Sequence, residues 1–465
     1  MKKRCMLIIP HQDDELFVGG SVLYEFANDI NWEVFVVYTT EGAGIYEEPE
    51  TRMKEAIKAL HIIGIPENNI IFLGYGNVWS DGINIYNKDD EVACVSKRGG
   101  SCTYALKNHQ DFSYLVYGEH SLYTRNNYKR DIKKVIMDIY PDVVIGVDMD
   151  DHQEHMATSL LLDECMSEIL KDKEDYCPLF LKKFAYDGLW RGEDDYFNLP
   201  RKETLNNPSY RNKTRNPMFQ WDERIRFAVP PKCNTIFLFR NILYKAAKQH
   251  RSQSGWLCAL RIINSDAIYW YKRTDNIALC ASTKVSSGNA SFINDFKVVD
   301  TNDVTNKDTK WCNCTWFPEQ EDEQKRVDIK LNQIKDIQYI CIYESPEKCA
   351  GEIKNMHIEF DDGFEFDTGE LIHGGCKNLF DLKRIHSVQK ICLVISDYVG
   401  KPGIAELELY KKNFEIEDYN IPCHVLNEDQ DSMRHIFIRR IVGAVEKKLV
   451  HLKYRLLEGK KYVRI

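Results

Sequence analysis

Short apolar runs alternate with longer amphipathic stretches between residue 5 and about residue 170. The apolar runs read CMLIIP, EVFVVYTT, NIIFLGYG and DVVIGVD, and stretches with helical periodicity, such as ETRMKEAIKALHIIG and HMATSLLLDECMSEIL, lie among them. Apolar runs without polar alternation are typical of strands buried on both faces, and intervening helices favour a parallel order. The pattern predicts a Rossmann-like α/β fold, a parallel sheet with helices on both faces.

The pattern changes near residue 275. Shorter alternating strands divided by turns follow, among them KRVDIKLNQIKDIQYICIYES and GIAELELYKK, and these are typical of an all-β sandwich with its own core. A basic amphipathic segment near the end, HIFIRRIVGAVEKKLVHLKYRLL, predicts a helix. A chain of 465 residues is too long for one ordinary core. We therefore expect an α/β domain over residues 1–275, a jelly-roll-like sandwich over 276–411 and a helical tail over 412–465.

Composition narrows the class of protein. The formal net charge of -9 argues against nucleic acid as the main partner. The 15 cysteines are odd in number and irregularly spaced, which is typical of reduced thiols. No apolar run reaches the length of a signal-peptide core or a transmembrane segment. A cytoplasmic protein is the simplest expectation.

Polar clusters follow two of the apolar runs. PHQDDE places His11, Asp13 and Asp14 directly after the first run, and the cluster 148–155 follows the fourth. In parallel sheets, functional sites form at the carboxyl ends of strands. The positive end of a helix accounts for one or two acids after a strand, but not for the histidine. A divalent cation accounts for both.

A metal site can be assembled from the two clusters. His11 and Asp14, three residues apart, can face one point, and His155 can join them from the second cluster. Two histidines and a carboxylate with open positions are typical of catalytic zinc. Asp13 is then left to take a proton from water. Each cluster alone has a structural reading, as a helix cap or a solvated acidic turn, but the conjunction favours a metal.

PHQDDE and the later HQEH together resemble the motifs of the PIG-L (LmbE-like) family of zinc-dependent N-acetylglucosaminyl deacetylases. The segments TTEG, RMKEAIKALHIIGI, FLGYG and KQHRSQ extend the resemblance over roughly residues 1–270. The resemblance implies that His11, Asp14 and His155 hold Zn²⁺ and that Asp13 is the general base. It also implies that His152 stabilises the oxyanion or assists the leaving amine. Flanking carboxylates predict that His152 is charged near neutral pH.

Three positions depart from the family pattern. Gln12 replaces a proline and contributes no ligand. Glu154 replaces an aspartate and is expected to orient a histidine from behind the metal. Asn77 stands where many members carry an aspartate, for which Asp81 is a possible substitute. The candidate substrate contacts are Arg52, Asn77 and Asp81. Residues 78–125 form a long polar and aromatic insertion, which predicts a lid or a substrate wall.

The second domain also carries a resemblance. NIALCASTKVSSGN, KWCNCTWFPEQ and GIAELELY resemble the F5/8 type C (discoidin-like, galactose-binding-like) fold over about residues 276–411. Such domains often bind carbohydrate, so the sandwich is a candidate for glycan contact. Trp311, Trp316 and Phe317 are candidates for stacking on a sugar, with burial of at least one as the alternative.

The favoured function is zinc-dependent removal of an acetyl group from an N-acetylated amino sugar, either a small molecule or a glycoconjugate. Two alternatives stay open. One is a non-catalytic carbohydrate-binding protein, which the complete set of histidines and aspartates disfavours. The other is a divalent-metal phosphohydrolase built on Asp13 and Asp14, which the lack of a P-loop-type glycine-rich phosphate loop disfavours.

Overall fold

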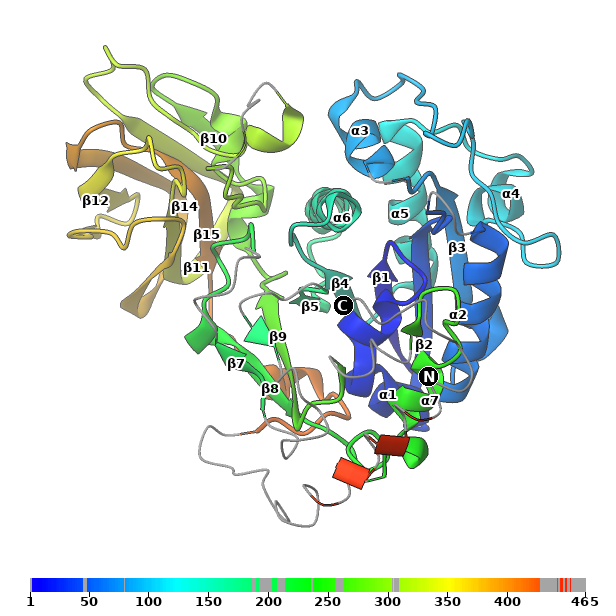
Figure 1. The fold of residues 1–465 in the computed structure, drawn as a ribbon. Helices are drawn as coiled ribbons and strands as arrows, with labels where there is room; N and C mark the ends of the chain where they lie inside the picture. The colour runs from blue at the N-terminus through cyan, green and yellow to red at the C-terminus, as the bar shows by residue number, and fades with distance from the viewer. Residues whose placement is uncertain are drawn as a thin grey trace.

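The computed structural model describes residues 2–44, 48–78, 80–185, 190–191, 203–206, 214–235, 237–255, 262–302, 304 and 309–426, with isolated positions between 441 and 452. An α/β layer and a β-sandwich lie side by side, and a long helix, α6 (Gln153–Asp172), lies between the sandwich and the sheet (Figure 1). The two predicted layers are therefore both present, and they share a contact surface.

The α/β layer is built on a seven-stranded sheet with the order β3-β2-β1-β4-β5-β9-β8. Its strands are β1 (Lys3–Ile9), β2 (Trp32–Thr40), β3 (Ile70–Tyr75), β4 (Val143–Val147), β5 (Leu179–Lys183), β8 (Ile225–Ala228) and β9 (Asp266–Lys272). The pairs among β1 to β5 are parallel, so the predicted parallel sheet is confirmed for these five strands. Strands β9 and β8 extend the sheet in antiparallel order.

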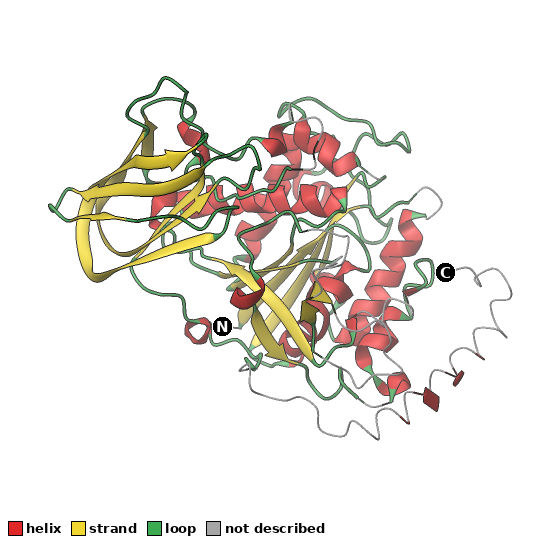
Figure 2. Cartoon of the chain, turned by 60° about the vertical axis from the view of Figure 1, so that its left-hand side comes forward, coloured by secondary structure: helices red, strands yellow, loops and turns green. Residues whose placement is uncertain are grey.

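Helices cover both faces of this sheet, as Figure 2 shows from the side. One face carries α1 (Gly20–Asn28), α2 (Pro49–Ile63) and α7 (Ile242–Ala247), and the other carries α3 (Asp81–Asn87), α5 (Arg125–Ile139) and α6. Successive side chains of a strand point to opposite faces. In β1, Leu7 accordingly packs into the first cluster and Ile8 into the second. Burial on both faces explains the continuous apolar runs of the sequence.

The structure of two segments differs from the continuous helix and the long loop that their sequences suggest. The sequence NTIFLFRNILYKAAKQHRSQ predicts one helix, but it contains a short 3-10 turn, η4 (Leu238–Arg240), and α7 begins only after Asn241. The Asn241 side chain accepts hydrogen bonds from the N–H groups of Leu243 and Tyr244, which is the geometry of an N-cap. The insertion 78–125 is partly helical, with α3 at its start and α4 (Phe112–Tyr117) further along.

The second body is an antiparallel β-sandwich, as predicted. Its strands are β10 (Ser282–Val285), β11 (Arg326–Glu344), β12 (Glu352–Phe360), β13 (Glu365–Asp367), β14 (Lys377–Val399) and β15 (Ile404–Tyr410). They pair in the order β10-β11-β14-β12-β13, with β15 against β11. Register shifts interrupt the long pairing of β11 with β14, and such bulges bend strands. The sandwich has its own apolar core, which includes Trp316, Ile340 and Leu393. A separate pair, β6 (Trp190–Arg191) and β7 (Leu205–Asn206), completes the described strands.

The sandwich is also joined to the α/β layer by a buried interface. Leu279, Trp311, Cys312 and Cys314 precede or enter the sandwich, yet they belong to the apolar cluster around α6. The buried Lys272 ammonium of β9 donates to the carbonyl oxygen of Phe296, in the segment between β10 and β11, and also lies 2.9 Å from the Asp163 carboxylate of α6. Trp311 is buried in this interface and Trp316 in the sandwich core, as expected for at least one of them, so neither ring is available to stack on a sugar.

Residues 412–426 lie against the α/β layer and do not form the predicted α-helix. They contain a 3-10 turn, η8 (Ile416–Tyr419), and Phe414 stacks on Tyr271 with ring centroids 3.6 Å apart. The amphipathic segment beyond them lies largely outside the described residues, so a helix there stays a prediction. Among the described helices, none has the length and apolarity needed to cross a membrane.

Candidate active site

The chain turns sharply where β1 ends, and this turn brings Asp14 back over His11. The His11 backbone N–H donates to Asp14 Oδ2 at 3.0 Å. A π-helical turn, η1 (Glu15–Gly19), follows directly and leads into α1. Turns of this kind are rare and are often found at functional sites. The motif PHQDDE thus lies at the carboxyl edge of the sheet, as predicted.

His155 joins these two residues from the start of α6. His11 Nδ1 lies 2.9 Å from Asp14 Oδ2 and 3.2 Å from His155 Nε2, and His155 Nε2 lies 3.3 Å from Asp14 Oδ2. In a tetrahedral zinc site with bonds of about 2.0–2.1 Å, the donor atoms lie about 3.3 Å apart. The three predicted ligands therefore present one nitrogen or oxygen each at spacings that suit a small divalent cation.

The charges of this triangle are strongly coupled. Burial raises the pKa of Asp14, but the charges of His155 and His11 outweigh it and hold that pKa well below its usual range. Burial lowers the pKa of His155, yet Asp150 and Asp14 raise it well above its usual value. Asp14 is therefore ionised, and the histidines supply the positive charge beside it. A divalent cation bound between the three groups would supply that charge instead.

Asp150 holds His155 from behind. His155 Nδ1 lies 2.8 Å from both carboxylate oxygens of Asp150, which is fully buried. Asp150 Oδ1 also accepts the backbone N–H of His152 at 2.8 Å. A proton on Nδ1 leaves Nε2 of His155 as a donor atom for a metal, the usual arrangement behind a metal-bound histidine. From the sequence, Asp150 was only one of the carboxylates that flank His152, and its contact with His155 was not predicted.

Glu154 does not take the role predicted for it. Its carboxylate accepts the backbone N–H of Gly82, with distances of 2.9 and 3.2 Å, at the start of α3. A Cβ on Gly82 would lie 2.1 Å from Glu154 Oε2, so this close contact requires glycine. Burial raises the pKa of Glu154 to about 8. Glu154 braces the insertion against α6, and the histidine is oriented by Asp150 instead.

Asp13 lies beside the triangle and contacts a buried arginine. Asp13 Oδ1 is 3.1 Å from Arg52 Nη2, and Arg52 also donates to the carbonyl oxygens of Gly42 and Gln12. Burial raises the pKa of Asp13 to about 6, although Arg52 lowers it. A carboxyl group that titrates near neutrality is suited to accept a proton from water. Arg52, predicted as a substrate contact, fixes this carboxylate and the loop after β2.

The other two candidate substrate contacts bind protein groups. Asn77 donates to the Ala43 carbonyl oxygen and accepts from the Thr40 hydroxyl, each at 2.8 Å. Asp81 accepts from the Val78 N–H at 2.9 Å and from the Ser96 hydroxyl at 2.7 Å. Both side chains are buried. The structure therefore gives them a supporting role in the loops after β2 and β3, in place of the predicted substrate contact.

His152 completes a cluster of three histidines. Its ring centroid lies 4.6 Å from that of His11 and 4.7 Å from that of His155, and one nitrogen of each ring lies within 4.8 Å of the others. His152 Nδ1 accepts the Glu154 N–H at 3.2 Å, so the proton of the neutral ring is on Nε2. The cluster makes His152 either a hydrogen-bond donor at the site or a further metal ligand.

The prediction of a charged His152 is wrong. Burial lowers its pKa to about 2, and the charges of His11 and His155 act in the same direction. The carboxylates that were expected to favour the charged form are engaged elsewhere, because Asp150 contacts His155 and Glu154 contacts Gly82. His152 is accordingly neutral and presents an N–H group.

A second buried pair supports the turn after β1. His250 Nε2, from the segment KQHRSQ, lies 2.6 Å from Glu15 Oε1, and both side chains are buried. In the same segment, the Ser252 hydroxyl donates to Glu55 of α2 at 2.7 Å. From the sequence, Glu15 was expected to cap or brace the following helix and was given no chemical role. The structure shows that it anchors η1 to a segment distant in sequence.

Comparison with known proteins agrees with this description of the α/β layer. Residues 6–166 match the family model described as GlcNAc-PI de-N-acetylase (PIG-L). This range contains Asp13, Asp150 and the three histidines of the cluster. The match supports a deacetylase-type function for this part of the chain. No curated protein matches the sequence.

Solved structures similar to this chain include modules that align with less than a third of it. The family 32 carbohydrate-binding module of C. perfringens NanJ, solved with galactose, is 15% identical over 28% of this chain and 92% of that chain, with a TM-score of 0.21. A fucose binding module of Streptococcus pneumoniae, SpX-3, is 21% identical over 30% and 98%, with a TM-score of 0.22. SpGH29 is 19% identical over 30% of this chain, with a TM-score of 0.23, and the alignment spans 28% of that protein.

Proposed function

We propose that the protein is a zinc-dependent hydrolase that removes the acetyl group from an N-acetylated amino sugar. One observation carries the proposal. His11 Nδ1, Asp14 Oδ2 and His155 Nε2 lie 2.9–3.3 Å apart, beside a carboxyl group, Asp13, whose pKa is raised toward neutrality. The match to the GlcNAc-PI de-N-acetylase family supports the choice of an acetylated amino sugar over other amides.

Each residue of the site has a separate role in amide hydrolysis. His11, Asp14 and His155 would hold the ion, which when bound would supply polarisation of the amide carbonyl and a lower pKa for water. Asp13 takes a proton from the attacking water and returns it to the nitrogen as the C–N bond breaks, which yields acetate and the free amine. His152 donates its Nε2 proton in a hydrogen bond to the carbonyl oxygen as that oxygen gains negative charge.

Acetate release from a panel of N-acetylglucosaminyl conjugates tests this proposal. The panel includes lipid-linked, oligosaccharide and nucleotide conjugates, and a phosphate monoester is assayed in parallel. We expect acetate from at least one conjugate and no phosphate. Phosphate release without acetate would instead indicate the phosphohydrolase, and sugar binding without any turnover would indicate a binding protein.

A further inference from the structure

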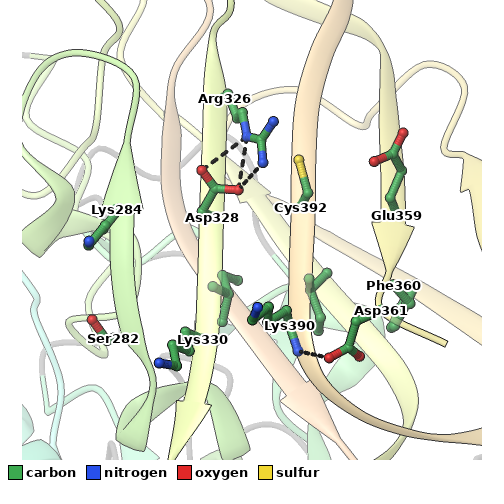
Figure 3. Close-up of a pocket in the computed structure, with 12 residues that line it drawn as sticks. Ser282, Lys284, Arg326, Asp328, Lys330, Glu359, Phe360, Asp361, Lys390 and Cys392 are labelled. Atoms are coloured by element: carbon green, nitrogen blue, oxygen red, sulfur yellow. Dashed lines mark hydrogen bonds and ion pairs between the residues drawn. The ribbon is translucent and has the colours of Figure 1, made fainter. Parts of the chain in front are cut away.

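A cavity lies on the outer face of the sandwich, away from the histidine cluster. It is a trough of about 460 Å³ across β10, β11, β14 and β12 (Figure 3). Its polar lining side chains come from strand positions that alternate with the positions of the sandwich core. Ile329 and Ile391 point inward, while their neighbours Lys330 and Lys390 point outward. The volume is within the range of sites that hold small organic ligands.

Three lysines of this trough have no carboxylate partner among the described residues. They are Lys284 on β10, Lys330 on β11 and Lys390 on β14, and all three are exposed. The fourth cation, Arg326, is different. Its guanidinium binds the Asp328 carboxylate at 2.6–3.0 Å, so these two charges neutralise each other. The uncompensated charge on this part of the trough is therefore positive.

Two of these lysines face each other across neighbouring strands. Lys330 and Lys390 are directly paired in the register of β11 and β14. Like charges directly opposite one another destabilise a sheet. The next outward-facing pair along these strands is Asp328 with Cys392, and the charge of Asp328 is already neutralised by Arg326. An anionic group placed between the two ammonium groups would remove the repulsion.

The opposite wall of the trough carries acceptors. Figure 3 shows Glu359 and Asp361 on the β12 side, with Lys284 and Lys330 on the other. The backbone N–H groups of Gln389 and Lys390 hold the Asp361 carboxylate in place at 3.1 and 3.0 Å. Carboxylates accept hydrogen bonds from hydroxyl groups. The trough thus offers ammonium groups to an anion and carboxylates to hydroxyls a few strands away.

The lining offers no ring face for stacking. Phe360 is its aromatic residue, and only 5% of its surface is exposed. Nucleobases and many neutral sugars are held by stacking on aromatic rings. The lining therefore favours a hydroxylated ligand recognised by its charge. The volume is also far larger than a simple inorganic anion requires.

We propose that this trough binds an anionic saccharide, a sugar that carries a carboxylate, phosphate or sulfate group. Lys330 and Lys390 bind the anionic group, and Glu359 and Asp361 accept hydrogen bonds from ring hydroxyls. The site lies on the sandwich and takes no part in the deacetylation proposed above. It gives the protein a site for charged glycans that is separate from the site of deacetylation.

Calorimetric titration of the full-length protein tests the proposal with four probes. Glucuronic acid and glucose 6-phosphate carry the anion, glucose is the neutral match, and inorganic phosphate is the anion alone. We expect binding of both anionic sugars that weakens as salt is added, little binding of glucose and weaker binding of phosphate. The double variant Lys330→Gln/Lys390→Gln should lose at least tenfold in affinity.

Matched controls make the result decisive. Lys348→Gln removes an exposed lysine of the same sandwich outside the trough and should leave the affinity unchanged. Lys330→Gln alone should raise the unfolding temperature, because it removes the repulsion between paired lysines. Acetate release should be the same in all these variants. Equal affinity in the double variant, equal affinity for phosphate and glucose 6-phosphate, or no binding of either anionic sugar would overturn the proposal.

Discussion

The buried carboxylate of Asp150 contacts Nδ1 of His155 through both of its oxygens, each at 2.8 Å. This contact fixes the ring of His155 and directs Nε2 toward His11 and Asp14. Removal of such a supporting group typically costs about 10–100-fold in metal affinity or activity. The variant Asp150→Asn should therefore bind zinc about 10–100-fold more weakly, as measured by competition with a chelator.

The neighbouring Asp151→Asn is the matched control for that experiment. The Asp151 side chain is 41% exposed, and the histidine contacts run to Asp150. We expect Asp151→Asn to bind zinc like the wild type. If Asp150→Asn also kept the wild-type affinity, the role given to Asp150 would be wrong.

Asp13 and Asp14 are adjacent in sequence but should respond differently to the same substitution. Asp13→Asn should retain the metal and lower kcat by roughly 10²–10⁴-fold, the range for a positioned proton-transfer group. Asp14→Asn should instead weaken metal binding, because Asp14 Oδ2 is one corner of the donor triangle. Metal analysis and kcat measured on both variants check this. An empty site in Asp13→Asn would reverse the assignment of the two residues.

His152→Ala should separate a hydrogen-bond donor from a metal ligand. The neutral ring presents its proton on Nε2, so we expect retained metal and a loss of about 10²–10³-fold in kcat, the usual size for one oxyanion donor. KM should change less than kcat. Loss of metal in this variant would make His152 a ligand, as its position within the three-histidine cluster also allows.

The interface between the two bodies should make the stability of the protein depend on pH. Glu164 of α6 lies 3.2 Å from Lys297 and 2.5 Å from Arg125. Burial alone would raise its pKa, but the charges of Lys297 and Arg125 lower it to about 2. A folded-state pKa below the unfolded value of about 4.5 stabilises the fold above pH 4.5, and this contribution is lost as the pH falls toward 2.

Chemical unfolding of Glu164→Gln at several pH values measures this contribution. The shift corresponds to about 3 kcal/mol, so the variant should be less stable than the wild type by up to that amount at pH 7. The difference should shrink below pH 4.5. Glu119→Gln, at an exposed position of the insertion, should have the stability of the wild type at every pH tested. A pH-independent loss in Glu164→Gln would mean that packing, not charge, explains it.

Much of the fold can be predicted from the sequence because the burial of a strand determines the pattern of apolar residues along it. The strands β1 to β4 were predicted from continuous apolar runs, and these runs reflect packing against helices on both faces. The antiparallel addition of β9 and β8 depends on pairing between distant segments, which no local pattern encodes. The burial of Trp311 is similar, since only the packing of the sandwich on α6 decides whether that ring faces solvent.

The candidate site was predictable in its donor atoms but not in its supports. The spacing of His11 and Asp14 and the strand ends on which both clusters lie were enough to bring them to one edge of the sheet. The sequence DMDDHQEH offers several acids near His155, and the loop conformation alone selects Asp150 to contact it. The same conformation turns Glu154 toward Gly82 and leaves His152 neutral.

We propose that His11, Asp14 and His155 hold an ion that is needed for amide hydrolysis. The most direct measurement is the rate of acetate release by chelator-treated protein as zinc is added back, with an N-acetylglucosaminyl conjugate as substrate. We expect almost no release without metal and a rise to a plateau at one equivalent of zinc, with no recovery in His155→Ala at that concentration. Acetate release that persists in the metal-free protein, or that recovers equally in His155→Ala, would contradict it.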